Sequence, residues 1–201
     1  MIGFISGFSG LTVLASVMIG IGQEFPYPTN WPAIVNNAKE DCSLISGEYE
    51  NTGQSEIPDS YGKFIEQPGS FSELPWVGIS SKQDNPTSFN LVYDTNTKIF
   101  NIEYLSSNKK YSSLMFPNSN NSNQIKQNLV CDNGQLIIET ETSGYGDGSS
   151  TNTKYYIALM KAVNGSLIVL YNIVNETTDL FIFKSEYKNF QWYQFQSHSP
   201  L

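Results

Sequence analysis

Two Asn-Gly pairs constrain this chain more than any other feature, because each one marks a point where two strands turn back on each other. Asn133-Gly134 and Asn164-Gly165 both lie between segments of alternating apolar and polar residues. Asn-Gly suits the two-residue type I′ turn, whose two central residues both need positive φ. Such turns join neighbouring antiparallel strands, so the sequence predicts consecutive hairpins.

The loop at Asn133-Gly134 also predicts a register. A two-residue loop pairs Asp132 with Gln135 and Cys131 with Leu136. Because successive side chains alternate between the two faces of a strand, this register gives the hairpin one apolar face. The residues expected on that face are Leu129, Cys131, Leu136 and Ile138, and those expected on the other are Gln135, Glu139 and Glu141. Cys131 should therefore point into the core.

The same reading of Asn164-Gly165 predicts a hairpin with two apolar faces. One face is expected to carry Tyr156, Ala158, Met160, Ala162, Leu167, Val169, Tyr171 and Ile173. The other is expected to carry Tyr155, Ile157, Leu159, Ile168, Leu170 and Val174, interrupted only by Lys161 and Asn172. Strands that are apolar on both faces are normally covered on both sides. We expect the cover to be the N-terminal arm, a partner or a ligand.

Further short segments alternate in the same way, at 47–51, 89–93, 100–104, 109–116, 179–184 and 190–195. Residues 52–87 read as irregular, with one helical turn between Ser70 and Pro75. The sequence therefore predicts an all-β fold, an antiparallel up-and-down meander of about 8–10 strands that forms a barrel or strongly bent sheet. A sandwich is the alternative. Residues 46–201 are expected to form a single barrel-like domain.

The N-terminus predicts export. Residues 1–23 hold no charged side chain, and Gly20-Ile21-Gly22 is a small-x-small site before Gln23. This segment is typical of a signal peptide or a membrane anchor. A buried segment is the third reading, and its five glycines count against it at about 1 kcal/mol each in a helix. Both of the first two readings place the rest of the chain outside the cytoplasm.

Residues 24–45 are predicted to form an arm that precedes the domain. Proline is frequent in it, and Asn30-Trp31-Pro32 has the residue types that open a helix. The arm is therefore expected to contain a short helix that runs to about Lys39.

The two cysteines, Cys42 and Cys131, are expected to form a disulfide. An even number of cysteines in an exported chain favours one, and closing a loop of about 90 residues stabilises a fold by about 4–5 kcal/mol. Two buried free thiols are the alternative. A catalytic cysteine is not expected, because the one candidate base, His198, lies in the C-terminal tail.

The composition argues against several classes of function. The chain has 11 basic residues, all of them Lys, against 19 acidic ones, so a nucleic-acid partner is not expected. One His and two Cys do not supply a zinc site, and neither a metal nor a cofactor is expected. The glycine-rich loop at 144–150 offers only Asp147 to a cation. Paired carboxylates such as Glu139 and Glu141 read as a solvated strand face, so no catalytic residue and no enzyme activity are expected.

Aromatic residues are the positive feature, with 12 Tyr, 12 Phe and 3 Trp. Rings that line a barrel mouth give an apolar ligand contact area together with polar groups. The candidate lining residues are Trp76, Tyr104, Tyr171 and Trp192, with filling of the core as the alternative role. The predicted function is a non-enzymatic binding module for a small apolar ligand or lipid. The alternatives are a structural or interaction subunit of an envelope complex and, third, a hydrolase or hydrolase inhibitor.

One segment points to a family. In residues 42–53, CSLISGEYENTG, a Cys is followed by Gly47, Tyr49 and Asn51, and this pattern resembles the start of the mature region of bacterial envelope lipoproteins of unknown function. The Asn164-Gly165 segment and the Trp-containing last strand are similar to theirs. Gly47-x-Tyr49 also resembles the opening strand of lipocalin-type barrels. The resemblance implies a periplasmic or cell-envelope location and no defined activity. Acidic and basic residues precede Cys42, so a lipid anchor there is not implied.

Overall fold

The structure is a computed structural model that describes residues 18–19, 23–35, 41–59, 63–74, 86–106, 109–116, 125–146, 148–179 and 183–198. In 18–19, 23–24, 109–116 and 125–127 the description covers the backbone alone. The strands are β1 (Met18–Ile19), β2 (Gln23–Glu24), β3 (Gly47–Pro58), β4 (Phe64–Ser70), β5 (Ser88–Asp94), β6 (Ile99–Ser106), β7 (Lys109–Phe116), β8 (Ile125–Asp132), β9 (Gln135–Gly146), β10 (Ser149–Lys161), β11 (Leu167–Asp179) and β12 (Phe183–Ser197). Two 3-10 turns, η1 (Cys42–Ile45) and η2 (Phe71–Glu73), complete the described elements.

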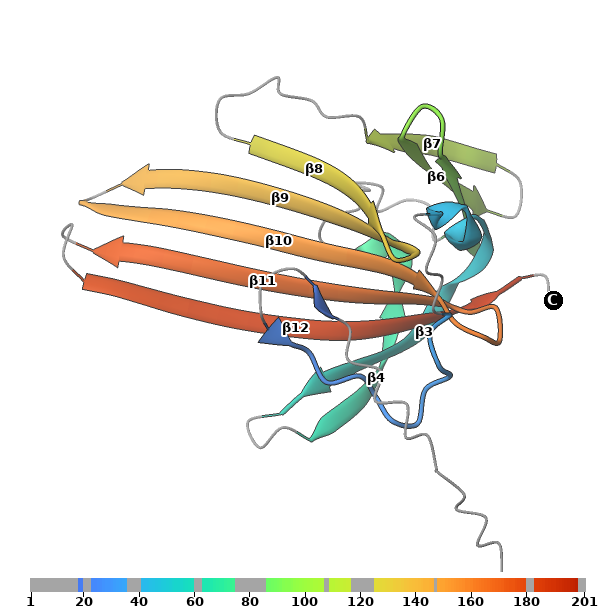
Figure 1. Ribbon diagram of the computed structural model, residues 1–201, viewed down its shortest axis with the longest axis horizontal. Helices are drawn as coiled ribbons and strands as arrows, with labels where there is room; N and C mark the ends of the chain where they lie inside the picture. The colour runs from blue at the N-terminus through green and yellow to red at the C-terminus, as the bar shows by residue number, and fades with distance from the viewer. Residues whose placement is uncertain are drawn as a thin grey trace, which may run out of the picture.

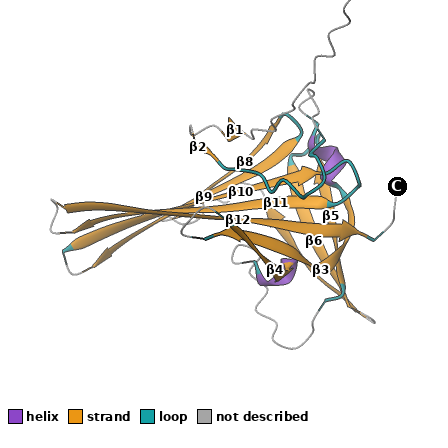
Figure 2. Cartoon of the chain, turned by 90° about the horizontal axis from the view of Figure 1, so that it is seen from below, coloured by secondary structure: helices purple, strands orange, loops and turns teal. Residues whose placement is uncertain are grey.

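One antiparallel sheet of ten strands dominates the fold, in the order β7-β6-β5-β3-β12-β11-β10-β9-β8, with β4 paired to β3 off this path. The sheet curls into a half-barrel, so that β5 and β6 lie across from β9 and β10 (Figures 1 and 2). The predicted all-β antiparallel meander with a strongly bent sheet is therefore confirmed. β3 joins the two runs of hairpins because it pairs with both β5 and β12.

The main core fills the concave side of the half-barrel. Phe71 of η2 stacks on Phe89 of β5 with ring centroids 3.7 Å apart, and it meets Phe195 of β12 edge to face at 5.3 Å. Strands from both halves of the sheet contribute to this cluster, including Tyr49, Leu91, Ile102, Leu136, Leu159 and Val169. Burial of these apolar side chains from both halves is what stabilises the curl.

A second cluster lies on the convex side. Ala158, Met160, Ile168, Leu170 and Trp192 present apolar side chains there, and the N-terminal arm covers them with Phe25 and Trp31. A bridge between Ile34 and Ala162 fixes the end of the arm. The expectation that the β10–β11 hairpin is covered on both faces is confirmed, and the convex cover is the arm.

The register at Asn133-Gly134 is the predicted one. Cys131 pairs with Leu136, and the two turn residues have φ of 49° and 77°. Both values are positive, as a type I′ turn requires. Leu136 and Ile138 accordingly lie in the concave core, with Leu129 and Cys131 packed against it.

The faces predicted from Asn164-Gly165 were wrong. Lys161 pairs with Leu167, and the Ala162 amide donates to the Ser166 carbonyl at 2.9 Å, so the loop holds the three residues 163–165. Of these only Gly165 has positive φ (86°). A three-residue loop of this kind is a type I turn followed by a left-handed residue. The shift by one residue moves Ile157 and Leu159 to the concave face and sends Ala158, Met160 and Ala162 to the convex face.

Two further predictions need correction. The helix expected from Asn30 is not formed over the described residues 30–35, which contain a turn and the Ile34 bridge; residues 36–40 lie outside the described part. Burial of Trp31 and pairing with Ala162 stabilise the arm more than a short helix would, because short isolated helices are only marginally stable in water. Residues 52–87 are also less irregular than expected, because β3 continues to Pro58 and β4 pairs with it.

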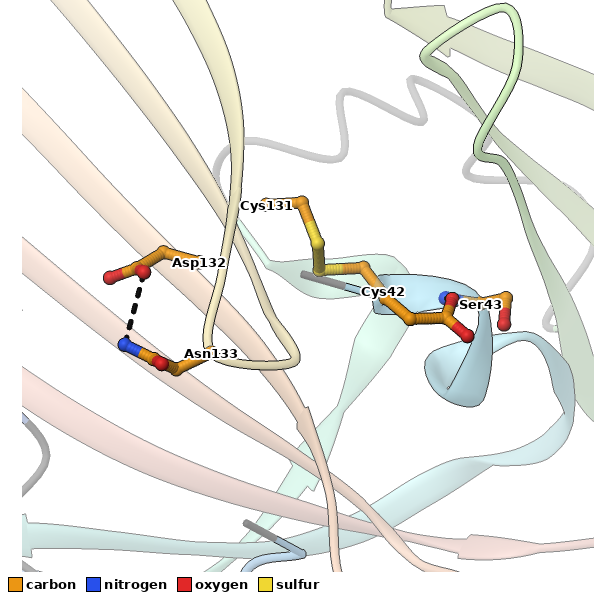
Figure 3. Close-up of a disulfide and its surroundings, with 6 residues drawn as sticks. Cys42, Ser43, Cys131, Asp132 and Asn133 are labelled. Atoms are coloured by element: carbon orange, nitrogen blue, oxygen red, sulfur yellow. Dashed lines mark hydrogen bonds between the residues drawn. A yellow bond between two sulfur atoms is a disulfide. The ribbon is translucent and has the colours of Figure 1, made fainter. Parts of the chain in front are cut away.

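The predicted disulfide is present. Cys42 and Cys131 are joined across 89 residues of sequence, with Cα atoms 5.9 Å apart. Figure 3 shows the bond linking η1 to the end of β8. The carboxylate of Asp41 accepts a hydrogen bond from the Ser43 amide at 2.9 Å and caps the turn that holds Cys42.

Candidate functional site: the strand extension

The four predicted lining residues are not brought together. Tyr104 and Tyr171 lie in the concave core, 1% and 6% exposed. Trp192 is on the convex side, where its indole Nε1 donates a hydrogen bond to the Pro26 carbonyl at 2.9 Å and Tyr27 packs against its ring. Trp76 lies outside the described residues. Trp192 therefore holds the arm and is separated from both tyrosines by the sheet.

The two concave tyrosines share an unusual feature. Within the described residues, the buried hydroxyls of Tyr104 and Tyr171 have no hydrogen-bond partner. Burial raises the pKa of both groups, and it raises the pKa of Tyr193 on the same side to about 12. The rings around them are packed by the protein's own Phe71, Phe89 and Phe195.

The least buried part of the sheet is a strand extension, formed by the segments 140–146, 149–155, 173–179 and 183–189 of β9 to β12. The four segments are in register from one end to the other, with Tyr155 opposite Thr140 and Ile173, and Ser149 opposite Gly146 and Asp179. Figure 1 shows these strands running well beyond the curled part of the sheet, and Figure 2 shows them as a thin layer. Within the described residues, the buried members of both clusters end where the extension begins, and only Tyr155 and Ile173 of the extension pack against the concave cluster.

The two faces of the extension differ in chemistry. The face continuous with the concave core carries Thr140, Thr142, Thr151, Thr153, Tyr155, Ile173, Asn175, Thr177, Asp179, Phe183, Ser185, Tyr187 and Asn189. Asp179 at the far end is the one ionisable carboxylate in that set. The convex face carries charges of both signs, Glu141, Lys154, Glu176, Lys184, Glu186 and Lys188. The first face is therefore a hydroxyl-rich surface with aromatic rings.

Large apolar side chains on the extension are unusually exposed. Tyr145 is 86% exposed, Phe183 67% and Tyr187 62%, and these are the highest values among the exposed large hydrophobic residues. Phe183 and Tyr187 lie on the hydroxyl-rich face, whereas Tyr145 lies on the charged face. Exposed apolar side chains that share one face, as Phe183 and Tyr187 do, are typical of an interaction site.

The predicted solvated carboxylates lie where expected. Glu139 accepts a hydrogen bond from Asn128 and Glu141 accepts one from Asn152, both on the convex side. Ser88 donates to Glu48 at 3.0 Å, and His198 Nε2 lies 4.0 Å from the same oxygen. The carboxylate thus stands between serine and histidine, whereas activation of a nucleophile needs the imidazole to accept the serine proton. Among the described residues, no cluster of three or more metal-ligating side chains occurs, and Asp147 lies outside them.

Sequence reasoning missed the extension. The sequence does contain a pattern that belongs to the extension: residues 140–153 and 174–179 are rich in Thr, Ser and Asn and have few apolar residues on either face. Period-two alternation predicts a strand from such a pattern, but without an apolar face it gives no sign of what the strand packs against.

Comparisons with protein-family models, with curated proteins and with solved structures gave no match. Within the described residues, no helix is long and apolar enough to cross a membrane. The resemblance to bacterial envelope lipoproteins stays a prediction.

Proposed function

We propose that this protein is an exported, non-enzymatic interaction subunit of the bacterial cell envelope, and that the strand extension is its contact surface. One observation carries the proposal: four paired strands project beyond both cores, and they hold Tyr145, Phe183 and Tyr187 largely in solvent. The interaction role is favoured over binding inside the half-barrel because the concave side is packed by the protein's own rings.

The energetics of the extension support a partner. Ordering each backbone residue costs about 1–2 kcal/mol, and in most strands the burial of apolar side chains offsets that cost. Here every side chain in the segment 183–189 is exposed. A partner that covers a large apolar side chain contributes about 1.5–3 kcal/mol for each one buried. The exposed rings are therefore the groups through which binding would stabilise the extension.

Two features support the proposed location. The Cys42–Cys131 disulfide is of the kind that persists in oxidising compartments such as the bacterial periplasm. The apolar N-terminal residues have the pattern of an export signal or an anchor. Both agree with a domain that works outside the cytoplasm.

A second candidate is the binding of a lipid surface or another small apolar ligand. It is favoured by the position of Tyr145 and Phe183, which lie near the same end of the extension on opposite faces. Aromatic rings are enriched at the headgroup level of membranes. Flotation with vesicles of phosphatidylethanolamine and phosphatidylglycerol tests this role. Loss of co-flotation in a Phe183→Ser variant would favour it, and absence of co-flotation of the native protein would exclude these lipids.

The interaction role is tested by shortening the extension. Residues 143–152 and 176–186 are each replaced by Asn-Gly, which leaves Thr142 opposite Thr153 and Asn175 opposite Tyr187. Neither segment contributes to the two clusters, so the thermal unfolding midpoint should change little. Native electrophoresis of gently solubilised envelopes from the natural host then reports the size of the complex.

We expect the native protein to migrate in a complex and the shortened variant to migrate at its own mass. Ile65→Ser is the matched control, because Ile65 is a 48% exposed apolar residue of β4 away from the extension. A complex that survives shortening, or one lost equally in the control, would overturn the proposal.

A further inference from the structure

One side of the extension is a strand edge that has no partner strand in the described part of the chain. Within the described residues, Phe183–Gln191 of β12 is paired with β11, whereas pairing with β3 begins at Trp192. β3 ends at Pro58, which has no backbone N–H to give to a ladder. We call Phe183–Gln191 the free edge of β12. The backbone N–H and C=O groups along such an edge form a template for a further strand.

The charges on the free edge are mixed in sign. Its convex face carries Lys184, Glu186 and Lys188, which alternate positive, negative and positive, and all three are exposed. Charged side chains, lysine above all, commonly protect a strand edge from pairing with unrelated strands. An edge with alternating charges disfavours the pairing registers that oppose like charges, and it favours the registers that oppose unlike charges.

A second copy fits this edge in one full-length register. Antiparallel pairing of the whole free edge with itself places its midpoint, Tyr187, on a two-fold axis. Glu186 of each copy then lies opposite Lys188 of the other. Centring the pair on Glu186 would instead oppose Glu186 to itself, and centring it on Lys188 would oppose Lys188 to itself. Opposite charges across a strand pair are stabilising and like charges are destabilising.

The surroundings of Glu186 strengthen the match. Glu186 lies directly opposite Glu176 on β11, so two carboxylates already face each other on this side of the sheet. Lys188 of the same strand forms an ion pair with Glu186, and Lys154 forms one with Glu176 at 3.4 Å. A lysine from a second copy would add a positive charge on the open side of Glu186.

We propose that two copies of this chain associate through the free edge of β12, antiparallel and with Tyr187 facing Tyr187, so that the two extensions form one continuous sheet. This rests on the proposed function in one respect, that the extension is the contact surface. The hydroxyl-rich faces of both copies lie on the same side of the joined sheet, because directly opposed residues share a face.

Charge reversal tests the register. Sedimentation equilibrium of the purified mature protein gives the dimer dissociation constant. Glu186→Lys opposes lysine to lysine at both contacts, and we expect it to weaken the dimer at least about tenfold. Glu186→Lys combined with Lys188→Glu restores opposite charges and should return the constant to the native range. Both positions are exposed, so folding should be retained, and circular dichroism checks this.

Cross-linking tests the geometry independently. Two Tyr187→Cys chains would carry thiols directly opposite each other, within the about 4.5–5.5 Å Cβ spacing of paired residues. Ser185→Cys is the control on the same face, because its two thiols would lie about 13 Å apart along the strands. We expect oxidation to give a covalent dimer with Tyr187→Cys and none with Ser185→Cys.

Three results would overturn the inference. The first is a native protein that stays monomeric up to its solubility limit. The second is a dimer whose dissociation constant is the same in the native protein and in the charge-reversal variants. The third is cross-linking at Ser185 in place of Tyr187, which would place the pairing in a shorter register. In the first case an envelope complex that depends on the extension would still support the proposed function, with a different protein as partner.

Discussion

The ammonium of Lys161 donates a 2.8 Å hydrogen bond to the Tyr49 hydroxyl and lies 4.6 Å from the centre of its ring, although the two residues are 112 positions apart. The same hydroxyl donates to the Ile45 carbonyl at 2.7 Å. One side chain of β3 therefore ties the end of β10 to the η1 turn that holds Cys42. Burial lowers the pKa of Lys161 and raises that of Tyr49.

Removing the Tyr49 hydroxyl should destabilise this junction. In Tyr49→Phe the ammonium loses its acceptor and the Ile45 carbonyl loses its donor, so we expect a loss of about 1–3 kcal/mol in the free energy of unfolding by urea. Lys161→Met is the matched control, since it removes the half-buried charge and leaves the bond from Tyr49 to Ile45. A control that loses more than Tyr49→Phe at pH 7 would contradict this account.

Stability should fall at alkaline pH because tyrosines are buried. Tyr193 has a pKa raised by burial to about 12, from an ordinary value near 10. The folded state therefore keeps a proton that the unfolded state releases. The stabilisation is fully present below about pH 10 and is lost as the pH rises through 12.

Urea unfolding at pH 9 to 12 measures this loss. Tyr193→Phe should reduce the loss of stability in that range, since it removes one of the titrating groups. Lys161 acts with the opposite sign, because a lowered pKa makes the folded state release its proton first. The comparison is therefore made in the Lys161→Met background. An equal loss with and without Tyr193 would refute the assignment.

The disulfide should account for a large part of the stability. Its loop spans 89 residues, for which the chain-entropy relation gives about 4–5 kcal/mol. We expect Cys42→Ala combined with Cys131→Ala to lose that amount in urea unfolding, while Val130→Ala, an exposed neighbour on β8, changes little. Intact mass of the unreduced protein should show two hydrogens fewer than the reduced form. Free-thiol labelling of both residues in natively exported protein would contradict the bond.

Gly53 should not tolerate a side chain. A Cβ there would lie 2.2 Å from the Gln194 carbonyl oxygen and 2.7 Å from the Phe195 ring, where β3 pairs with β12. The first contact is with backbone, so Gly53→Ala has to separate the two strands. We expect a loss of about 1–3 kcal/mol, measured by thermal unfolding. Gly146→Ala is the control, because nothing lies within 4 Å of its Cβ. Equal stability of the two variants would exclude the close approach.

Local turn chemistry explains why one hairpin register was predicted correctly and the other was not. At Asn133-Gly134 both central residues adopt positive φ, as the two-residue loop demands. At Asn164-Gly165 only Gly165 does, and the Ser166 amide donates to the Asn164 side chain. The same dipeptide suits both loops, and packing of Leu159 and Val169 into the concave core selected the longer one.

Other features needed contacts that are remote in sequence. β4 contains Pro68 and Gly69, which argue against a strand, and it forms because β3 offers it a partner over Thr52–Pro58. Trp192 is of a residue type that often lines ligand sites. It instead lies on the convex face, where the arm covers it and the Pro26 carbonyl accepts its hydrogen bond. The candidate lining set could therefore not be separated from the core by composition.

The sequence by itself determined that this chain forms antiparallel strands, where one of its tight turns lies, and that Cys131 points toward the core. These follow from alternation and turn stereochemistry, which act over a few residues. Only the tertiary structure decided how far the sheet curls, that the arm covers its convex face, and that β9 to β12 extend beyond both cores. Alternation assigns residues to faces, and what covers each face depends on segments far away in the chain.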